Sequence, residues 1–343
     1  MRVAMYYSNK DVRLEEMPKP EAGPGEMVVK IEASGICGTD CLEWYRIHRV
    51  PLVLGHEIAG TIAELGEGVK GYNVGDRVAV SHHVPCLECR FCKDGHESVC
   101  DTLRKTNFFP GGFSEYVRVP KINIDKGGVY KLPDNVNFED ATFIEPLACV
   151  LRGQRLARVK KGGTVLVVGS GISGILHIKL AKAAGAGKIF ATDISAFRLD
   201  AARKSGADFV WSAGDYSPEK LKKKNNGYLA DFVILCTGAI SAVSQALKSV
   251  ERGGTVLFFA ASPKDAAIPI PINDIFWRSE VTLASSYAGS PDDHRKALKH
   301  ISSGVVRVGD MITHRLTLKE ADIGFKLVAK ADESMKVIVE CQK

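Results

Sequence analysis

The feature that most constrains the fold is a glycine pattern near the middle of the chain, Gly169-Ser-Gly171-Ile-Ser-Gly174, with the spacing G-x-G-x-x-G. It follows an apolar run over residues 164–168 and opens a helical pattern over residues 172–184. In this context the first glycine makes a tight turn, the second lets the backbone approach a pyrophosphate, and the third lets helix and strand pack closely. The free N–H groups of the helix N-terminus then face the phosphates. The predicted cofactor contacts of this turn are Gly169, Gly171, Ile172, Ser173 and Gly174.

Apolar strands and amphipathic helices alternate over residues 163–260. Besides residues 164–168, we expect strands over residues 188–192, 232–235 and 255–259. Such alternation is typical of parallel strands with helices on both faces of the sheet. The pattern therefore predicts a doubly wound, dinucleotide-binding domain.

One acidic residue indicates which dinucleotide binds. Asp193 ends the second strand, nineteen residues after Gly174. A carboxylate at that position accepts hydrogen bonds from the hydroxyls of the adenosine ribose and repels a 2′-phosphate, so we expect NAD rather than NADP. Arg198, five residues further, either contacts the adenine or ribose, where it would weaken the NAD preference, or belongs to a surface helix.

Four cysteines with the spacing C-x2-C-x2-C-x7-C lie in the first third of the chain. They are Cys86, Cys89, Cys92 and Cys100. Four thiolates close a tetrahedron around one Zn²⁺, and a site with four protein ligands has no open position. We therefore predict a structural zinc lobe over about residues 84–102. The alternative is a nucleic-acid-binding zinc module, but that needs basic and aromatic neighbours, and this segment carries four acidic residues instead.

A second set of metal-ligand residue types is spread over the first 150 residues. Its members are Cys37, His56, Glu57 and Glu145. Thiolate, imidazole and carboxylate are a normal Zn²⁺ ligand set, and three protein ligands leave one position for water or substrate. A lone cysteine or histidine is usually structural, but this set accompanies a cysteine lobe and a nicotinamide-binding pattern. The set therefore predicts a catalytic zinc, so we expect two zinc ions per chain.

The composition is that of a globular protein, with 45% hydrophobic and 25% charged residues among 343. The net charge of +6 comes from scattered basic residues, so we expect no nucleic-acid partner. No apolar stretch approaches the ~18 residues of a membrane span, and the first residues lack the apolar core of a signal peptide. Nine cysteines without an export signal predict a reducing compartment, the cytoplasm, where thiols bind metal or stay free.

Short β-type runs, broken by glycine and proline, fill residues 1 to about 148. Three examples are residues 27–31, 60–65 and 77–81. This pattern predicts a barrel-like or sandwich-like β domain. It returns from about residue 289, with a helix over residues 291–301 and a strand over residues 335–340. We therefore expect the first domain to be discontinuous.

The order of these motifs resembles the zinc-dependent medium-chain dehydrogenase/reductase family. Further matching segments are Cys37-Gly-Thr-Asp40, Gly55-His-Glu-Ile-Ala-Gly60 and Gly75-Asp-Arg-Val78. The resemblance implies an α/β protein with a GroES-like, β-rich catalytic domain over residues 1–148 and 289–343. It implies a Rossmann NAD-binding domain over residues 149–288.

The resemblance also implies roles for residues near the predicted catalytic zinc. Glu145-Pro-Leu resembles the branch of polyol, sorbitol, threonine and galactitol-phosphate dehydrogenases, since familiar alcohol dehydrogenases place a cysteine ligand in that region. Either Glu57 or Glu145 is then the third ligand, and the sequence does not choose between them. Thr39 matches the hydroxyl of the family's proton relay. Leu42 stands where relatives carry a relay histidine, and His48 is a further candidate by its place in the sequence.

The implied activity is zinc-dependent, NAD(H)-linked interconversion of a secondary alcohol of a polyol or sugar-type substrate and its ketone. Trp44 and Tyr287 are expected in the substrate pocket, although Ser286 replaces an arginine of sorbitol dehydrogenases; otherwise the two aromatics belong to the core. Thr237 is a further expected cofactor contact. Because relatives associate through the Rossmann sheet edge, we expect a homodimer or homotetramer, with residues 281–284 as the interface strand.

Two other functions stay open at this stage. One is a zinc enzyme that acts on simple or aromatic alcohols and aldehydes, as a dehydrogenase or as a reductase; the glutamate-rich zinc site favours polyols instead. The other is a catalytically inactive, nucleotide-binding regulatory homologue. The presence of Cys37, His56 and Glu145 argues against a protein that has lost catalysis.

Overall fold

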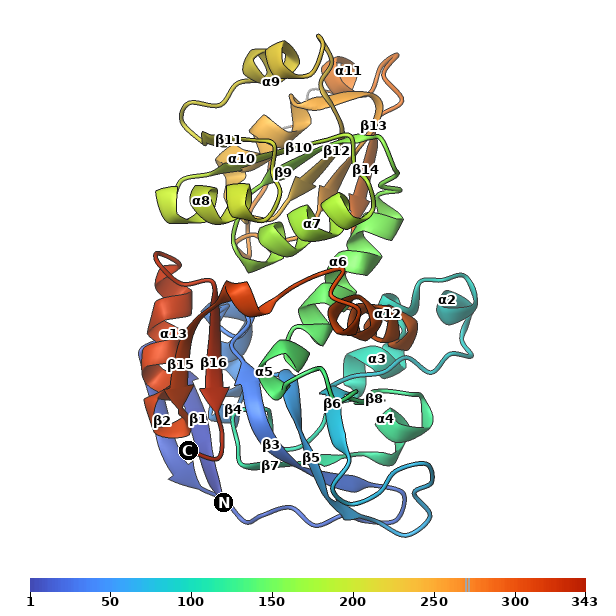
Figure 1. The fold of residues 1–343 in the computed structure, drawn as a ribbon, viewed down its shortest axis with the longest axis vertical. Coiled ribbons are helices and arrows are strands. Elements are labelled where there is room, and N and C mark those ends of the chain that lie inside the picture. The colour runs from blue at the N-terminus through green and yellow to red at the C-terminus, as the bar shows by residue number, and fades with distance from the viewer. Residues whose placement is uncertain (269, 271) are drawn as a thin grey trace. The chain divides into compact units, whose positions relative to one another are not determined.

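The computed structural model describes residues 1–268, 270 and 272–343, which form two compact units (Figure 1). Unit 1 consists of Met1–Ala148 and Ala288–Lys343, and unit 2 consists of Cys149–Tyr287. Unit 1 is therefore assembled from two separate stretches of the chain. None of the helices in the described part of the chain is both long and apolar enough to cross a lipid bilayer.

Unit 1 is built on two sheets (Figure 1). The larger sheet has the strand order β15 (Ile312–Thr317), β16 (Lys336–Glu340), β3 (Met27–Gly35), β5 (Glu57–Leu65), β6 (Arg77–Ser81) and β8 (Val129–Lys131), and β7 (Tyr116–Val119) also pairs with β3. The smaller sheet has the order β2 (Asp11–Glu16), β1 (Arg2–Ser8) and β4 (Leu52–Val53). Because β16 pairs with β3, with Ile338 opposite Gly35, the C-terminal stretch completes a sheet that the N-terminal stretch begins.

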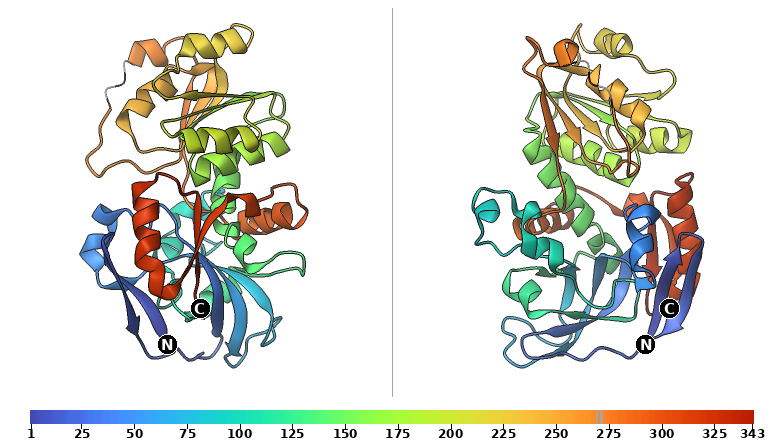
Figure 2. Two further views of the ribbon diagram at one scale, coloured as in Figure 1. Left: turned by 60° about the vertical axis from the view of Figure 1, so that its left-hand side comes forward. Right: turned by 180° about the vertical axis from the view of Figure 1, so that it is seen from behind.

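The core of unit 1 joins both sheets to helix α13 (Ala321–Lys330), which lies beside β15 and β16 (Figure 2). The ring of Phe325 lies 5.3 Å from the ring of Tyr6 and 5.5 Å from that of Phe113. All three side chains are buried, and burial of one large apolar side chain contributes about 1.5–3 kcal/mol. This packing fixes the position of β16 against the rest of the unit.

The remaining helices of unit 1 are mostly short. They are α1 (Glu43–Arg46), η1 (Ile47–Arg49), α2 (Arg90–Lys93), η2 (Glu97–Val99), α3 (Asp101–Lys105), α4 (Lys121–Asp125), α5 (Phe138–Ala141), α12 (Pro291–Ser302), η3 (Gly309–Met311) and η4 (Leu318–Glu320). Helix α6 (Ile144–Leu156) begins in unit 1 and ends in unit 2. Helix α12 begins with a capping box. The N–H of Asp293 donates to Ser290 Oγ at 3.2 Å, and Asp293 Oδ2 accepts the N–H of Ser290 at 2.9 Å.

Unit 2 contains one parallel sheet of six strands. Their order is β11 (Phe209–Ser212), β10 (Lys188–Asp193), β9 (Thr164–Val168), β12 (Ala230–Leu235), β13 (Val250–Phe258) and β14 (Thr282–Ser285). The helices of the unit are α7 (Ile172–Ala183), α8 (Ala196–Lys204), α9 (Pro218–Lys224), α10 (Ile240–Leu247) and α11 (Ile272–Ile275). The strand order reverses beside β9, as in dinucleotide-binding folds. The predicted α/β class, with a β-rich part and a Rossmann sheet, is confirmed.

Several strand ends differ from the sequence prediction, and those of β3 and β5 lie nearest the candidate metal ligands. The pattern predicts strands over residues 27–31 and 60–65, whereas β3 continues to Gly35 and β5 starts at Glu57. These extra residues pair with each other, with Gly35 opposite Glu57. Pairing with neighbouring strands extends β3 through small residues whose own β propensity is low. Helix α7 ends at a left-handed glycine, because Gly185 follows it with φ +77°.

Candidate metal centres and dinucleotide site

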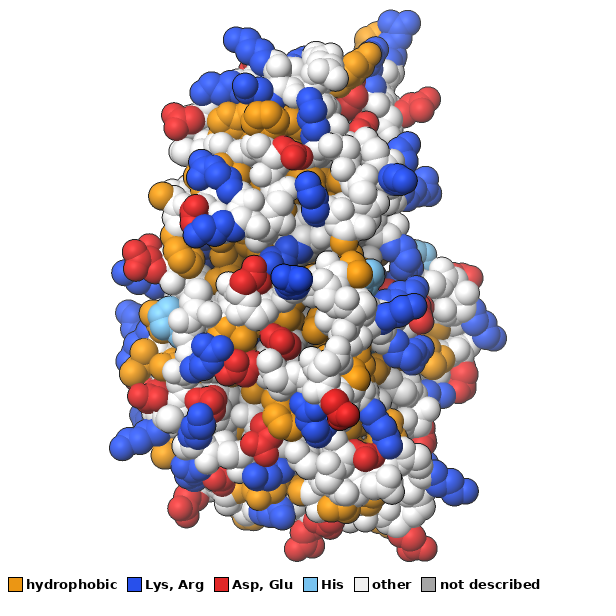
Figure 3. Space-filling model, in the orientation of Figure 1, with side chains coloured by type: hydrophobic (Ala, Val, Ile, Leu, Met, Phe, Trp, Pro, Cys, Tyr) orange, Lys and Arg blue, Asp and Glu red, His pale blue; other side chains and the backbone are white. Residues whose placement is uncertain are grey.

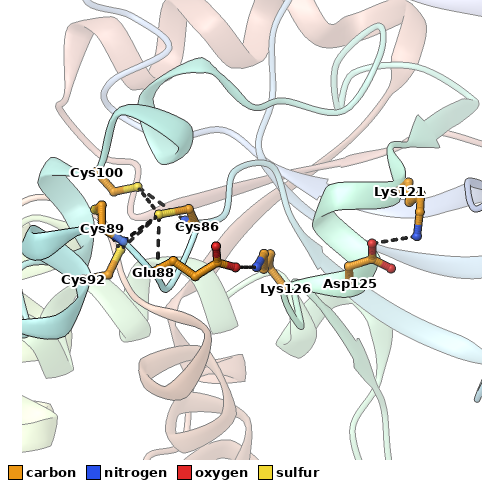
Figure 4. Close-up of polar contacts among 8 residues, drawn as sticks. All are labelled: Cys86, Glu88, Cys89, Cys92, Cys100, Lys121, Asp125 and Lys126. Atoms are coloured by element: carbon orange, nitrogen blue, oxygen red, sulfur yellow. Dashed lines mark hydrogen bonds and ion pairs between the residues drawn. The ribbon is translucent and has the colours of Figure 1, made fainter.

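Four cysteine sulfurs converge in a loop of unit 1 (Figure 4). The Sγ–Sγ distances are 3.9 Å for Cys86–Cys92, 3.6 Å for Cys89–Cys92 and 3.6 Å for Cys86–Cys100. With a Zn–S distance of about 2.3 Å, the edge of a tetrahedron of sulfurs is about 3.8 Å long. The four thiols therefore fit one tetrahedral zinc ion without rearrangement.

The thiols differ in pKa, and a cation bound to all four would make them all thiolates. Burial raises the pKa of Cys100, but hydrogen bonds from the backbone of Cys86 and Leu103 outweigh burial and lower the pKa to about 6. Burial raises the pKa of Cys92 to about 12. Metal binding stabilises every coordinated thiolate, so it releases the proton of Cys92.

The surface around the lobe does not resemble a nucleic-acid interface. Glu88 of the lobe forms an ion pair with Lys126, the residue after α4, at 2.6 Å (Figure 4). On the face that Figure 3 shows, acidic and basic side chains are interspersed. A nucleic-acid-binding domain presents a continuous basic patch or stripe. The lobe is therefore better explained as a structural element.

Cys37, His56 and Glu57 meet because β3 and β5 are antiparallel neighbours. Gly35 lies opposite Glu57, so Cys37, which follows β3, and His56, which precedes β5, reach the same end of the strand pair. One ligand atom from each of the three residues lies within 4.8 Å of the others. Thiolate, imidazole and carboxylate at this spacing fit Zn²⁺, and three ligands leave a coordination position open.

Asp40 orients two of these ligands. Its Oδ2 accepts the N–H of Cys37 at 3.1 Å, and its Oδ1 lies 3.3 Å from Nδ1 of His56. A carboxylate at Nδ1 leaves Nε2 of the imidazole for a metal, which is the usual arrangement of a ligating histidine. Burial by itself lowers the pKa of His56, but the charges of Asp40 and Cys37 outweigh burial and raise it well above its usual value. Asp40 and Cys37 thus favour a positive charge at the His56 imidazole.

Lys336 of β16 is the partner of Glu57. Its Nζ donates to Glu57 Oε2, and the two side chains are 0% and 1% exposed. Nζ also lies 5.2 Å from the ring centroid of Phe143. Burial raises the pKa of Glu57, and the charge of Lys336 opposes that rise. No local pattern marks Lys336, so it is missing from the sequence prediction.

Glu145 lies beside Glu57 but outside the three-residue cluster. It occupies the first turn of α6. Glu57 and Glu145 line one cavity of about 10 Å³, together with Tyr130 and His294. The charge of Glu145 contributes to the raised pKa of Glu57, after burial. The structure therefore brings Glu57 together with Cys37 and His56, and places Glu145 next to Glu57.

Two histidines that the sequence prediction missed lie beside this cluster. The ring centroid of His82 is 5.0 Å from that of His56 and 3.7 Å from that of His83. Burial, and then the neighbouring His83 and His56, lower the pKa of His82 well below its usual value. The available signal was strand register, because Ser81 ends β6 opposite Glu57, and the two histidines follow it directly.

The predicted relay and substrate residues differ in their placement. Thr39 is exposed, and its Oγ1 donates to Cys37 Sγ at 3.2 Å. Leu42 precedes α1, and His48 is exposed on η1. Trp44 is 40% exposed in unit 1 and Tyr287 is 57% exposed in unit 2. Neither aromatic is a core residue of its unit, so the core-packing interpretation is wrong for both.

The glycine turn of unit 2 has the backbone that the pattern requires. Gly169 has φ +93°, and a Cβ there would lie 3.2 Å from Thr237 Cβ, so these two predicted cofactor residues are neighbours. A Cβ on Gly174 would lie 2.0 Å from the carbonyl oxygen of Gly169, which no side chain tolerates. Because glycine has no side chain, these glycines present only backbone at the start of α7. Ile172 and Ser173 are the first residues of that helix.

Asp193 holds this turn from the end of β10. Its Oδ2 accepts the N–H of Ser170 at 2.6 Å, and its Oδ1 accepts the N–H of Ser195 at 2.9 Å. A carboxylate has about four lone-pair sites, so each oxygen retains capacity for a ribose hydroxyl. Arg198 of α8 lies nearby, since a Cβ on Gly171 would be 3.9 Å from its guanidinium carbon. Within the described residues, Nε of Arg198 is buried without a hydrogen-bond partner.

Comparison with known proteins places the chain in a family. Two family models match it: the alcohol dehydrogenase GroES-like domain over residues 23–134 and the zinc-binding dehydrogenase over residues 171–303. Sorbitol dehydrogenase of Ovis aries is 33% identical, over 96% of this chain and 94% of its own. The chain belongs to the zinc-dependent medium-chain dehydrogenase/reductase family. The predicted family and the predicted oxidoreductase class are therefore confirmed.

Solved structures resemble this dehydrogenase over its full length. Galactitol-1-phosphate dehydrogenase of Escherichia coli has a TM-score of 0.87 at 26% identity, covering 99% of this chain and 100% of its own. A zinc-binding dehydrogenase of Sinorhizobium meliloti 1021 bound to NADP has a TM-score of 0.86 at 28% identity, covering 99% of both chains. The choice between NAD and NADP in this dehydrogenase therefore depends on its own residues.

Proposed function

We propose that this dehydrogenase oxidises a secondary alcohol of a polyol or sugar-type substrate to the ketone with NAD, and catalyses the reverse reduction. The observation that carries the proposal is the cluster of Cys37, His56 and Glu57, held by Asp40 at one end of the β3–β5 pair. The relatives named sorbitol dehydrogenase and galactitol-1-phosphate dehydrogenase support the substrate class.

The reaction transfers a hydride from the carbinol carbon to the nicotinamide and releases the hydroxyl proton. A zinc ion held by the cluster supplies a Lewis acid that stabilises negative charge on the substrate oxygen. Cys37 and His56 hold that ion, and Asp40 fixes the tautomer and orientation of His56. Thr39 offers the hydroxyl nearest in sequence to Cys37 and is exposed, so we assign it the first step of proton release.

We assign Glu57 as the third protein ligand and Glu145 as its neighbour. Glu57 has an oxygen within 4.8 Å of the other two ligand atoms, and Glu145 faces the small cavity beside it. We also propose two zinc ions per chain, because the four-cysteine lobe independently fits a tetrahedral ion. All nine cysteines are free of disulfides, which supports a reducing, cytoplasmic location.

NAD is the proposed cofactor because Asp193 stands at the end of β10, with its Oδ2 hydrogen-bonded to Ser170 of the glycine turn and its Oδ1 hydrogen-bonded to Ser195. Its charge would repel the 2′-phosphate of NADP. Arg198 would contact the ribose or the adenine from α8. We propose association through β14, an edge strand whose first and last residues, Thr282 and Ser285, are exposed. Pairing of two such edges gives a homodimer, from which a homotetramer can be built.

The test is NAD reduction by the zinc-loaded protein across polyols, sugar phosphates, threonine and simple alcohols. We expect turnover with polyols or sugar phosphates to exceed turnover with simple alcohols. Cys37→Ser should abolish turnover while NAD binding persists. The matched control is Cys341→Ser, which changes a buried cysteine that lies in neither metal cluster and should keep most activity. Retained turnover in Cys37→Ser would refute the catalytic assignment, and preference for simple alcohols would refute the substrate class.

A further inference from the structure

A small cavity inside unit 1 is lined in part by Glu57 of the candidate catalytic cluster. Its volume is about 10 Å³, counted as the space that the centre of a water molecule can occupy. A cavity of roughly this size holds one water when its walls offer polar partners. Its polar walls come from Glu57, Glu145, Thr142, Tyr130 and His294, and the rest of its lining is apolar.

Two of these polar side chains are buried, and each has one polar atom without a hydrogen-bond partner among the described residues. Tyr130 is 5% exposed and His294 is 2% exposed. Neither Oη of Tyr130 nor Nε2 of His294 has a hydrogen-bond partner among the described residues. The two rings are stacked in parallel, with their centroids 5.3 Å apart. A buried polar atom without a partner costs about 1–3 kcal/mol, so a partner is expected for both atoms.

The tautomer of His294 follows from its other nitrogen. Nδ1 lies 2.9 Å from the carbonyl oxygen of Ser290, which only accepts hydrogen bonds, so Nδ1 carries the proton. Burial lowers the pKa of His294, so the ring is neutral near pH 7. Nε2 is therefore an acceptor. The capping box of α12 fixes Ser290 and with it the orientation of this ring.

We propose that this cavity binds one structural water that joins Tyr130 and His294 to the carboxylate of Glu145. The hydroxyl of Tyr130 donates to the water, and the water donates to Nε2 of His294 and to Glu145. These three hydrogen bonds are the usual number for a buried water. Glu145 is the chosen carboxylate because it lines the cavity and its charge acts on both Glu57 and His294.

The water makes Tyr130 and His294 positioning residues for the metal centre. It anchors Glu145, and the charge of Glu145 in turn acts on Glu57. Loss of an outer partner of a metal site commonly lowers metal affinity or activity by about 10- to 100-fold. The kinetic part of this inference rests on the proposed function, whereas the water and its hydrogen bonds do not.

The first experiment is a crystal structure of the zinc-loaded enzyme at a resolution that shows ordered water. We expect one water within about 2.7–3.2 Å of both Tyr130 Oη and His294 Nε2. Crystals of the Tyr130→Phe variant in the same form should lack this water or show it displaced. A dry cavity in the native enzyme would overturn the proposal.

The second experiment compares Tyr130→Phe with Tyr72→Phe in the enzyme reconstituted with Co²⁺ at the catalytic position. Tyr72 is the matched control, because its hydroxyl donates to the carbonyl of Val129 at 3.0 Å and does not line the cavity. We expect Tyr130→Phe to shift the visible absorption of bound Co²⁺ and to lower kcat about tenfold, with KM for NAD unchanged. Tyr72→Phe should change neither quantity.

Each outcome of these experiments is decisive. A cobalt spectrum of Tyr130→Phe identical to that of Tyr72→Phe would overturn the positioning role, even if both variants lose stability. His294→Leu should reproduce the spectral shift, because it removes the acceptor from the opposite side of the water. If the native enzyme oxidises no polyol, the proposed function fails, but the bound water and the cobalt spectrum still decide this inference.

Discussion

Substitution of Lys336 by methionine removes the positive partner of the buried Glu57 carboxylate. Lys336 and Glu57 form an ion pair and are 0% and 1% exposed. Methionine keeps much of the length of the lysine side chain and removes the ammonium group. The substitution is best made in the Cys37→Ser background, because loss of the thiolate keeps metal from binding to Glu57. The four-cysteine lobe is intact in that background.

We expect Lys336→Met to lower the free energy of unfolding of unit 1 by about 3–5 kcal/mol at pH 7.5, because it leaves a buried carboxylate unpaired. For a unit of about 200 residues, 1 kcal/mol corresponds to about 2–4 °C in melting temperature. The expected loss is therefore about 6–20 °C. The matched control is Lys343→Met, whose exposed pair with Glu340 should contribute under about 1 kcal/mol.

The loss should shrink as the pH falls. Burial raises the folded-state pKa of Glu57, and removal of Lys336 raises it further. A carboxyl with a raised folded-state pKa favours the folded state below its unfolded pKa and loses that contribution as the pH rises through the folded value. Calorimetry at pH 5.5 and 7.5 should therefore show a smaller penalty at pH 5.5.

A double variant completes the test. Glu57→Gln combined with Lys336→Met removes both charges, so it should recover most of the stability that Lys336→Met loses. A penalty under 1 kcal/mol for Lys336→Met at pH 7.5, or a double variant as unstable as the sum of the single ones, would refute the reasoning. Zinc added to Lys336→Met with Cys37 present should restore part of the loss, because the ion gives Glu57 a new counter-charge.

Three further predictions concern the other sites. Gly174→Ala should destabilise unit 2 by about 1–3 kcal/mol, because its Cβ would meet the carbonyl of Gly169 at 2.0 Å. Gly171→Ala, whose Cβ would meet only the Arg198 guanidinium at 3.9 Å, should keep stability but weaken NAD binding in calorimetric titration. Cys89→Ser should reduce the bound zinc, measured by elemental analysis, from two ions per chain to one and lower the melting temperature, whereas Cys341→Ser should retain both ions. Asp193→Ala should move the ratio of kcat/KM for NAD over NADP toward NADP by about 10- to 100-fold, since it removes charge-assisted hydrogen bonds to the ribose; an unchanged ratio would contradict the cofactor assignment.

Patterns that are local in sequence were sufficient for the fold class and for the cysteine lobe. The residues from the apolar strand through Gly169 to α7 predict the turn directly, because Gly174 avoids a Cβ clash with Gly169, which is close to it in sequence. The four cysteines span only fifteen residues, so their spacing alone predicts the tetrahedron that the sulfur distances fit.

Local sequence patterns could not predict which distant residues meet at the candidate site, because strand pairing brings them together. Cys37, His56 and Glu57 were recognisable as ligand types, but their convergence depends on the register of β3 and β5. Lys336 lies 279 residues from Glu57 in sequence, and only the insertion of β16 beside β3 brings them together. Tyr130 and His294 likewise come from separate stretches of unit 1, so no spacing rule connects them.

The split construction of unit 1 also sets the order in which a newly synthesised chain acquires its parts. The ribosome releases β16 only after all of unit 2, so every residue of unit 2 is synthesised before Lys336, the partner of Glu57. Until then, the end of β3 near Ser34 and Gly35 lacks its neighbour on that side. Neutralisation of the buried Glu57 carboxylate by Lys336 therefore has to wait until unit 2 has been synthesised.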